Sequence, residues 1–175
     1  MVVENFANAI SPAMKPHMEL VSKRVKRRVG VLISGSGTNL QAIINHVQDP
    51  TIGSLADISL VISNKSGVEG LKRAEKAGIP TKIISHKDFK TREEFDLELL
   101  KQLQAAKIEF VVLAGFMRIL TPVFVNAYRG KLINIHPALL PSFKGTHAHK
   151  QALDAGVRLT GCTVHFVDVC LTYKI

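Results

Sequence analysis

The sequence predicts an α/β fold with a doubly wound, mostly parallel sheet. The first observation is that continuous apolar runs rich in β-forming residues, such as residues 29–34, are typical of parallel strands covered on both faces. The second is that a glycine turn and an amphipathic helical segment follow, as residues 35–47 follow the first run. Regular alternation of the two kinds of segment specifies right-handed crossovers between parallel strands.

The remaining elements continue this alternation along the chain. Thr91 stands three residues before Glu94, which is the capping-box pattern at the start of an amphipathic helix. Gly78 and Gly156 close two other helices. Strands are expected at 57–63, 81–85, 109–115, 132–135 and 162–167, and helices at 67–78, 91–107 and 147–156.

We expect three parts in the chain: an irregular basic linker at 1–28, one α/β domain at 29–167 and a tail at 168–175. The net charge is +9, and the linker, with six basic and two acidic residues, supplies +4 of it. The basic run at 23–28 fits either a nucleic-acid patch or a solvated linker. No aromatic residues interleave to stack bases, which favours the linker and no nucleic-acid partner.

The composition predicts a reducing compartment, with the cytoplasm as the default location. The two cysteines, Cys162 and Cys170, lack the spacing of a C-x-x-C metal site, and the chain is long enough to fold without disulfides. No apolar run approaches the roughly 18 residues of a membrane helix. The N-terminus also lacks the pattern of a signal peptide, so we expect no membrane partner.

Three loops are expected to meet at one edge of the sheet, after Ser34, after Leu113 and at 134–136, because ligands in such sheets collect at the carboxyl ends of the strands. The first loop, SGSGTNLQ at 34–41, combines a glycine turn with a helix N-terminus, whose free N–H groups and dipole favour a phosphate. It lacks a Walker lysine, and Leu40 stands where a dinucleotide fingerprint has its third glycine. The motif therefore fits a phosphomonoester site or a simple glycine turn.

The second loop, LAGFMRIL at 113–120, places an arginine among four apolar residues that we expect to be exposed: Phe116, Met117, Ile119 and Leu120. Such a mixture suits the faces of a flat aromatic ligand. The alternative is ordinary core packing of a strand-to-helix turn. The position at a strand end favours the ligand.

The third loop ends a strand on Asn134 and His136, two positions apart and so on the same face. His136 suits a general acid and base near neutral pH, and Asn134 suits a donor to a developing oxyanion. The alternative is a buried, hydrogen-bonded histidine that caps the strand. The other histidines, at 147, 149 and 165, have no ligand spacing, so no metal is expected.

Six motifs together resemble phosphoribosylglycinamide formyltransferase, the family of de novo purine biosynthesis that uses 10-formyltetrahydrofolate. They are VLISGSGTNLQAII, ISNK, AGIPT, VLAGFMRIL, NIHPALLPSFKGTHAHKQAL and GCTVHFV, in this order across residues 28–167. The resemblance implies a Rossmann-like domain. It implies direct transfer of a formyl group from the folate to the amine of glycinamide ribonucleotide, without a metal.

The resemblance also implies roles for individual residues. Gly37, Thr38 and Asn39 match the loop that binds the substrate phosphate. Asn134 and His136 match the catalytic pair, in which the amide polarises the formyl oxygen and the imidazole moves protons. The folate-binding positions are Arg92, Met117, Arg118, Ile119, Leu120 and Asn134, of which 117–120 match the wall around the pteridine.

The ends of the chain add two expectations. Residues 2–7 resemble the tail of the aminoimidazole ribonucleotide synthetase domain of animal trifunctional polypeptides, so covalent neighbour domains are expected beside the small-molecule substrates. After residue 167 the likeness stops: Thr172 stands where the family has its catalytic aspartate, and residues 168–175 are a non-family tail. We therefore expect a sheet that lacks its C-terminal elements, an exposed apolar edge or face, and little or no transferase activity.

Two other functions stay open. The first is a related formyltetrahydrofolate enzyme, either a transfer-RNA formyltransferase or a formyltetrahydrofolate hydrolase, against which the cradle at 34–41 argues. The second, from a different class, is a non-catalytic fragment that binds a ribonucleotide or a protein partner.

Overall fold

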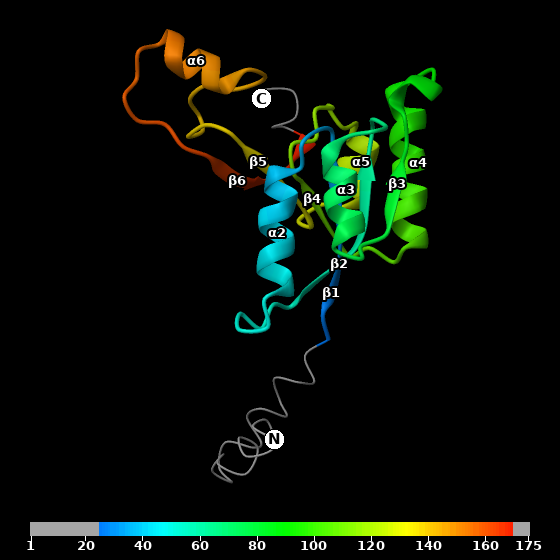
Figure 1. Ribbon diagram of the computed structural model, residues 1–175. Coiled ribbons are helices and arrows are strands. Elements are labelled where there is room, and N and C mark those ends of the chain that lie inside the picture. The colour runs from blue at the N-terminus through cyan, green and yellow to red at the C-terminus, as the bar shows by residue number, and fades with distance from the viewer. Residues whose placement is uncertain (1–24, 170–175) are drawn as a thin grey trace, which may run out of the picture.

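The protein, described for residues 25–169 in a computed structural model, has a sheet of six strands in the order β3-β2-β1-β4-β5-β6 (Figure 1). Neighbouring strands are parallel except β5 and β6, which are antiparallel. The predicted Rossmann-like α/β class is confirmed. The strands are β1 (Arg27–Ile33), β2 (Ala56–Ser63), β3 (Thr81–Ile83), β4 (Phe110–Leu113), β5 (Leu132–His136) and β6 (Thr163–Phe166).

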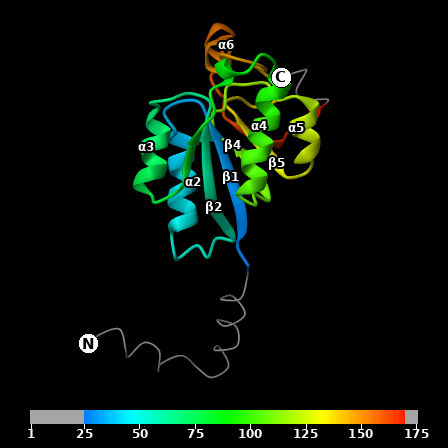
Figure 2. The same ribbon diagram turned by 90° about the vertical axis from the view of Figure 1, so that its right-hand side faces the viewer.

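Two layers of helices enclose the sheet, with α2 and α3 on one face and α4 and α5 on the other (Figure 2). One apolar cluster fills each gap, so the central strands are buried on both sides. This explains why their sequences are continuously apolar rather than alternating. The helices are α2 (Thr38–Gln48), α3 (Glu69–Lys76), α4 (Arg92–Ala105), α5 (Pro122–Ala127) and α6 (Ala148–Asp154), with a short 3-10 turn at His86–Asp88.

The bounds of the elements differ from the expected ones by a few residues; for example, the strands expected at 81–85 and 109–115 end at Ile83 and Leu113. Helix α5 was not expected, because its six residues are too few to show a helical period. Strand β1 begins at Arg27, two residues earlier than expected. Arg27 pairs with Ala56 in the sheet and its guanidinium contacts the Glu109 carboxylate at 2.6 Å, which extends the strand to the domain edge.

Helix α4 begins at the predicted capping box. The Thr91 hydroxyl accepts a hydrogen bond from the Glu94 N–H at 3.1 Å, and the Glu94 carboxylate accepts from the Thr91 N–H at 3.3 Å. Both bonds satisfy backbone donors that a helix start otherwise leaves free. They also fix the position of Arg92, the first residue of the helix.

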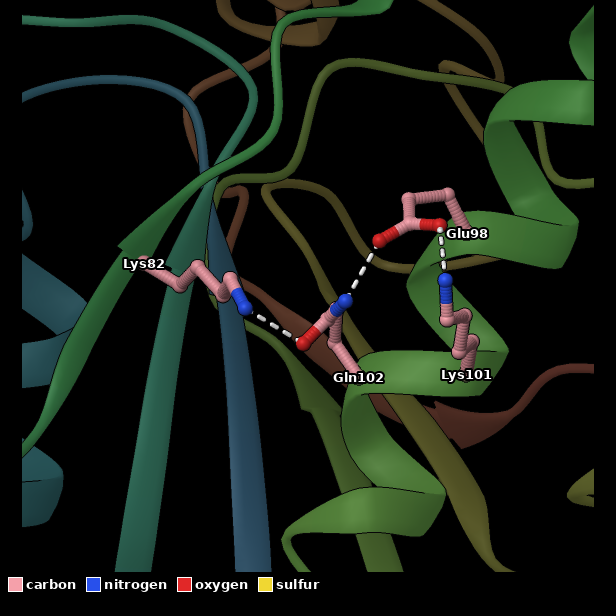
Figure 3. Close-up of polar contacts among 4 residues, drawn as sticks. All are labelled: Lys82, Glu98, Lys101 and Gln102. Atoms are coloured by element: carbon pink, nitrogen blue, oxygen red, sulfur yellow. Dashed lines mark hydrogen bonds and ion pairs between the residues drawn. The ribbon is translucent and has the colours of Figure 1, made fainter.

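A polar network joins edge strand β3 to helix α4 (Figure 3). Lys82 donates from Nζ to the Gln102 Oε1 at 2.5 Å, and Gln102 donates in turn to Glu98. Glu98 also pairs with Lys101 at 3.6 Å. Exposed ion pairs of this kind contribute little stability, but a lysine on an edge strand discourages pairing with other chains.

Strand β6, the outer strand on the other side of the sheet from β3, has an apolar face exposed to solvent. Val164 and Phe166 of β6 are 60% and 58% exposed, and they lie opposite Ile135 and Ile133 of β5. The four side chains therefore share one face of the β5–β6 pair. The predicted exposed apolar face is confirmed here.

We predict that Thr91→Ala lowers the free energy of unfolding by about 1 kcal/mol, because it removes the side-chain acceptor of the capping box. Thr91→Ser is the matched control, since it keeps the hydroxyl and is expected to stay close to the wild type. Urea unfolding followed by circular dichroism measures both. Equal stability of the alanine and serine variants would show that the cap contributes nothing.

Candidate active site

The site is built where the winding of the sheet reverses. β1 lies between β2 and β4, so crossovers run in opposite directions from it, and the loops that leave β1 and β4 diverge around a crevice. A cavity of about 170 Å³ occupies this point. It is lined by both loops, through Ser34, Gly35, Ser36, Gly37, Thr38, Asn39, Ala114, Gly115 and Met117. Of the three loops expected to converge, those after Ser34 and after Leu113 line this cavity, and residues 134–136 do not.

The turn after β1 leaves the start of α2 open to an anion. Gly37 precedes the helix with φ +71°, a backbone conformation that glycine adopts without strain. A Cβ atom there would lie 2.5 Å from the Gly70 Cα, so no other residue fits. Gly37 offers no side-chain cap, and Thr38 and Asn39 are exposed on the first turn. The first N–H groups of α2 and its positive dipole end therefore form an anion cradle.

A second contact fixes the loop after β4 against the cradle. The Met117 N–H donates to the Ser34 hydroxyl at 2.8 Å, and Ser34 is buried. Two segments more than eighty residues apart in the chain are thus held as one wall of the cavity. Met117 and Ile119 project outward, 71% and 52% exposed.

The expectation that Phe116 and Leu120 are exposed is wrong. Both are buried, at 8% and 3% exposure, in the core that also contains α4 and α5. The chain turns at Gly115, with φ +74°, so alternate side chains point inward and outward. The Leu120 side chain consequently belongs to the core, and only its backbone is left for a role in binding.

A buried carboxylate ties α4 to this loop. Asp96 is 1% exposed, and its Oδ2 accepts hydrogen bonds from the Thr121 N–H at 2.6 Å and the Thr121 hydroxyl at 2.7 Å. Burial raises the pKa of Asp96, against the opposite effect of these bonds and of the charges of Arg118 and Arg92. The structure thus brings Arg92 close to the loop that carries Arg118. Sequence analysis did not identify Asp96. The feature that could have identified it is a charged residue at a core-facing position of the helix.

Asn134 and His136 lie on one face of β5, as predicted, since the strand is regular through both. Asn134 is opposite His165 of β6, and its Nδ2 lies 3.3 Å from the His165 Nε2. The His165 Nδ1 lies 3.0 Å from the Phe166 carbonyl, which only accepts, so we assign the proton to Nδ1 and the acceptor role to Nε2. Nδ2 of Asn134 then keeps one N–H to donate elsewhere. Sequence analysis had considered His165 only as a metal ligand.

The His136 ring is 3% exposed, and its Nε2 lies 2.9 Å from the Phe143 carbonyl. Because a carbonyl only accepts, Nε2 is the donor and Nδ1 is the remaining basic nitrogen. The ring therefore matches the alternative expectation, a buried and hydrogen-bonded histidine at a strand end. Its hydrogen bond to the loop after β5 fixes its tautomer.

The sheet register places Asn134 near the cradle. Leu32 of β1 pairs with Leu113 of β4, which pairs with Asn134 of β5. Two inter-strand spacings, about 10 Å in total, therefore separate the backbones of β1 and β5 at this level. The amide and the glycine turn belong to the same edge of the sheet.

A larger cavity, of about 790 Å³, lies at the other end of the parallel strands, where β1 and β4 begin. Its lining includes Arg27, Glu109, Tyr128 and Lys131. The carboxyl ends of α4 and α5 point to this end, so the helix dipoles there oppose an anion. Arg27 is also engaged with Glu109. The smaller cavity at the switch point is the better candidate site for a phosphate.

An α/β domain with an open helix N-terminus at its switch point and an amide on a nearby strand is the class of fold and site that the structure defines. Comparison with known families gives the particular class. The formyl transferase family matches residues 27–171, and this chain belongs to that family.

Three similar proteins show the extent of the match. The trifunctional purine biosynthetic protein adenosine-3 of Drosophila pseudoobscura pseudoobscura is 54% identical over 168 residues, which is 96% of this chain and 12% of that protein. Phosphoribosylglycinamide formyltransferase of Escherichia coli is 48% identical over 137 residues, 78% of this chain and 64% of that enzyme. The crystal structure of glycinamide ribonucleotide transformylase 1 from Symbiobacterium toebii superposes with a TM-score of 0.78 at 43% identity, over 82% of this chain and 66% of that one.

Residues 25–169 contain neither a membrane-spanning helix nor a grouped set of metal-ligating side chains. No helix among them is long and apolar enough to cross a membrane. No three His, Cys, Asp or Glu side chains in the same range are grouped as metal ligands.

We predict that Asp96→Asn stabilises the protein at pH 7, because it removes a buried charge while an amide oxygen still accepts from Thr121. The pKa of Asp96 is raised on folding, so its protonation adds to the free energy of unfolding of the wild type. This contribution is fully present below the unfolded pKa and is lost as the pH rises through the folded pKa. The gain in the variant should therefore shrink as the pH falls through the raised pKa of folded Asp96, and should be gone below the unfolded pKa of about 4. Urea unfolding at several pH values measures it.

The matched variant is Asp96→Ala, which leaves the Thr121 N–H and hydroxyl without their acceptor and is expected to cost about 2 kcal/mol. A pH-independent loss of stability in Asp96→Asn would contradict the assignment of a buried, charged Asp96.

Proposed function

We propose that the chain binds glycinamide ribonucleotide and 10-formyltetrahydrofolate at the switch point, as the site of a phosphoribosylglycinamide formyltransferase. The observation that carries the proposal is the anion cradle before α2, about two strand spacings from an amide with a free donor on β5. The names of the Escherichia coli and Symbiobacterium toebii relatives support the same reaction. The trifunctional relatives support covalent neighbour domains as partners.

The ribonucleotide phosphate would bind the backbone N–H groups at Gly37, Thr38 and Asn39, where the dipole of α2 favours a dianion. The Thr38 hydroxyl and Asn39 amide, both exposed, add donors at the rim. A single phosphate suits the small cavity of about 170 Å³ better than a dinucleotide does.

The folate would lie along the loop after β4. Met117 and Ile119 supply exposed apolar contacts for a flat ring system. Arg118 Nε is buried and has no hydrogen-bond partner among the described residues, which suits an acceptor on the ligand. Arg92, brought close through Asp96, supplies a second positive charge for the folate carboxylates. Leu120 would contribute through its backbone.

The chemistry follows from the donor and the base. The substrate amine attacks the formyl carbon and forms a C–N bond, while the formyl oxygen takes the negative charge and accepts from the Asn134 Nδ2. The bond from carbon to the folate nitrogen then breaks, and that nitrogen takes a proton while the amine loses one. Nδ1 of His136 is the basic nitrogen that would carry this proton, because Nε2 is bonded to Phe143.

A second function is favoured by one observation. His136 is buried and bonded to the Phe143 carbonyl, so its ring is not open to solvent in this structure. Thr172, at the position of the family aspartate, lies outside the described residues. A chain that binds the ribonucleotide with little transfer activity fits the buried, hydrogen-bonded ring of His136.

Calorimetry with glycinamide ribonucleotide and with a non-reactive folate analogue, followed by a formyl-transfer assay, separates these functions. Binding of both ligands with turnover supports the enzyme. Binding of the ribonucleotide without turnover supports the non-catalytic function. No binding of the ribonucleotide at millimolar concentration would overturn the proposal.

We predict that Gly37→Ala weakens ribonucleotide binding at least tenfold, because its Cβ would collide with Gly70 and its φ is +71°. Gly130→Ala is the matched control, since Gly130 has the same φ of +71°, a Cβ there meets nothing within 4 Å, and the residue lies outside this cavity. Calorimetric titration of both variants measures the difference. Equal affinities for the two variants would mean that the ribonucleotide does not use this turn.

A further inference from the structure

The amino-terminal turn of α3 lies directly against the cradle. The Gly70 N–H donates to the Gly35 carbonyl at 3.1 Å, and a Cβ on Gly70 would lie 2.6 Å from the Ile33 Cδ1. One turn further along α3, the Arg73 guanidinium donates from Nε to the Ser36 carbonyl at 3.0 Å. Helix α3 therefore binds two consecutive carbonyl groups of the glycine turn.

These two bonds determine where the donors of the turn point. In a trans peptide, the carbonyl of one residue and the N–H of the next point in opposite directions. Because α3 holds the Gly35 and Ser36 carbonyls, the N–H groups of Ser36 and Gly37 are directed away from α3. Both of those residues line the cavity at the switch point.

Arg73 is itself held in place by the cradle helix. Its Nη1 lies 3.4 Å from the Gln41 Oε1 on α2, and the Gln41 Nε2 donates to Asn45 at 2.8 Å. Its Cδ would also lie 3.5 Å from a Cβ on Gly37. The guanidinium thus bridges the glycine turn and the first turn of α2.

We propose that Arg73 is a positioning residue for phosphate recognition: it orients the backbone donors of the cradle and, resting on the function proposed above, selects the phosphate of the ribonucleotide. The role depends on geometry more than on charge, because a fixed N–H must meet the Ser36 carbonyl. Arg73 lies outside the motifs that sequence analysis assigned to the site.

Lys72 provides a matched control for charge. It neighbours Arg73 on α3, but it is 70% exposed and pairs with Glu69 at 3.3 Å. Lys72→Met removes one positive charge from the same helix without touching the turn. Arg73→Met removes the charge and the hydrogen bond, and Arg73→Lys keeps only the charge.

The test is calorimetric titration of the full chain and these variants with three probes: glycinamide ribonucleotide, its phosphate-free nucleoside and a folate analogue. Arg73→Met is expected to bind the ribonucleotide about tenfold more weakly, the size of one charge-assisted hydrogen bond, with folate binding unchanged. The affinity ratio of ribonucleotide to nucleoside should fall by the same factor. Arg73→Lys should recover only part of the loss, and Lys72→Met should match the wild type.

Three outcomes overturn the proposal: an unchanged affinity ratio in Arg73→Met, full recovery in Arg73→Lys, or an equal loss in Lys72→Met. If Arg73→Met fails to fold, it loses folate binding as well. The ratio of ribonucleotide to nucleoside affinity in Arg73→Lys then decides the question. Failure of the proposed function is distinguishable, because the wild type itself would not bind the ribonucleotide. Amide ¹H–¹⁵N spectra give an independent readout, in which Arg73→Met should shift the Gly37 N–H and Lys72→Met should not.

Discussion

The placement of β1 between β2 and β4 is the constraint on which the site depends. It separates the loops that leave β1 and β4, and it places the amino end of α2 beside the crevice that results. The same strand order sets β5 two spacings from β1, so Asn134 and the glycine turn lie at the same end of the parallel strands. A different strand order with the same local sequences would scatter these groups over separate edges.

Loops at the carboxyl ends of the strands are held by polar contacts to rigid elements. Ser34 at the end of β1 binds the Met117 N–H, Asp96 of α4 binds Thr121, and Arg73 of α3 binds the Ser36 carbonyl. Each contact engages a backbone N–H or carbonyl group of the loop. Preorganised backbone donors cost little further ordering when a ligand binds, which suits a site built from loops.

Features of the fold and site were predictable from the sequence when their determining residues lie close together in the chain. The capping box at Thr91 and the glycine turn at Gly37 are local patterns, and both are found as expected. The contacts of Asp96, Arg73 and His165 join residues 25, 37 and 31 positions apart, so no local pattern contains both partners.

The directions of Phe116 and Leu120 were misjudged for a related reason. The way a chain leaves a strand is set by the helices that pack beside it, here α4 and α5, and not by the loop sequence alone.

The most direct test of the account is a crystal structure of the full chain with glycinamide ribonucleotide. We predict the phosphate within hydrogen-bond distance of the Gly37–Asn39 backbone nitrogens, with the amine directed toward Asn134. A phosphate in the cavity beside Arg27 and Lys131 at the other end of the strands would contradict it.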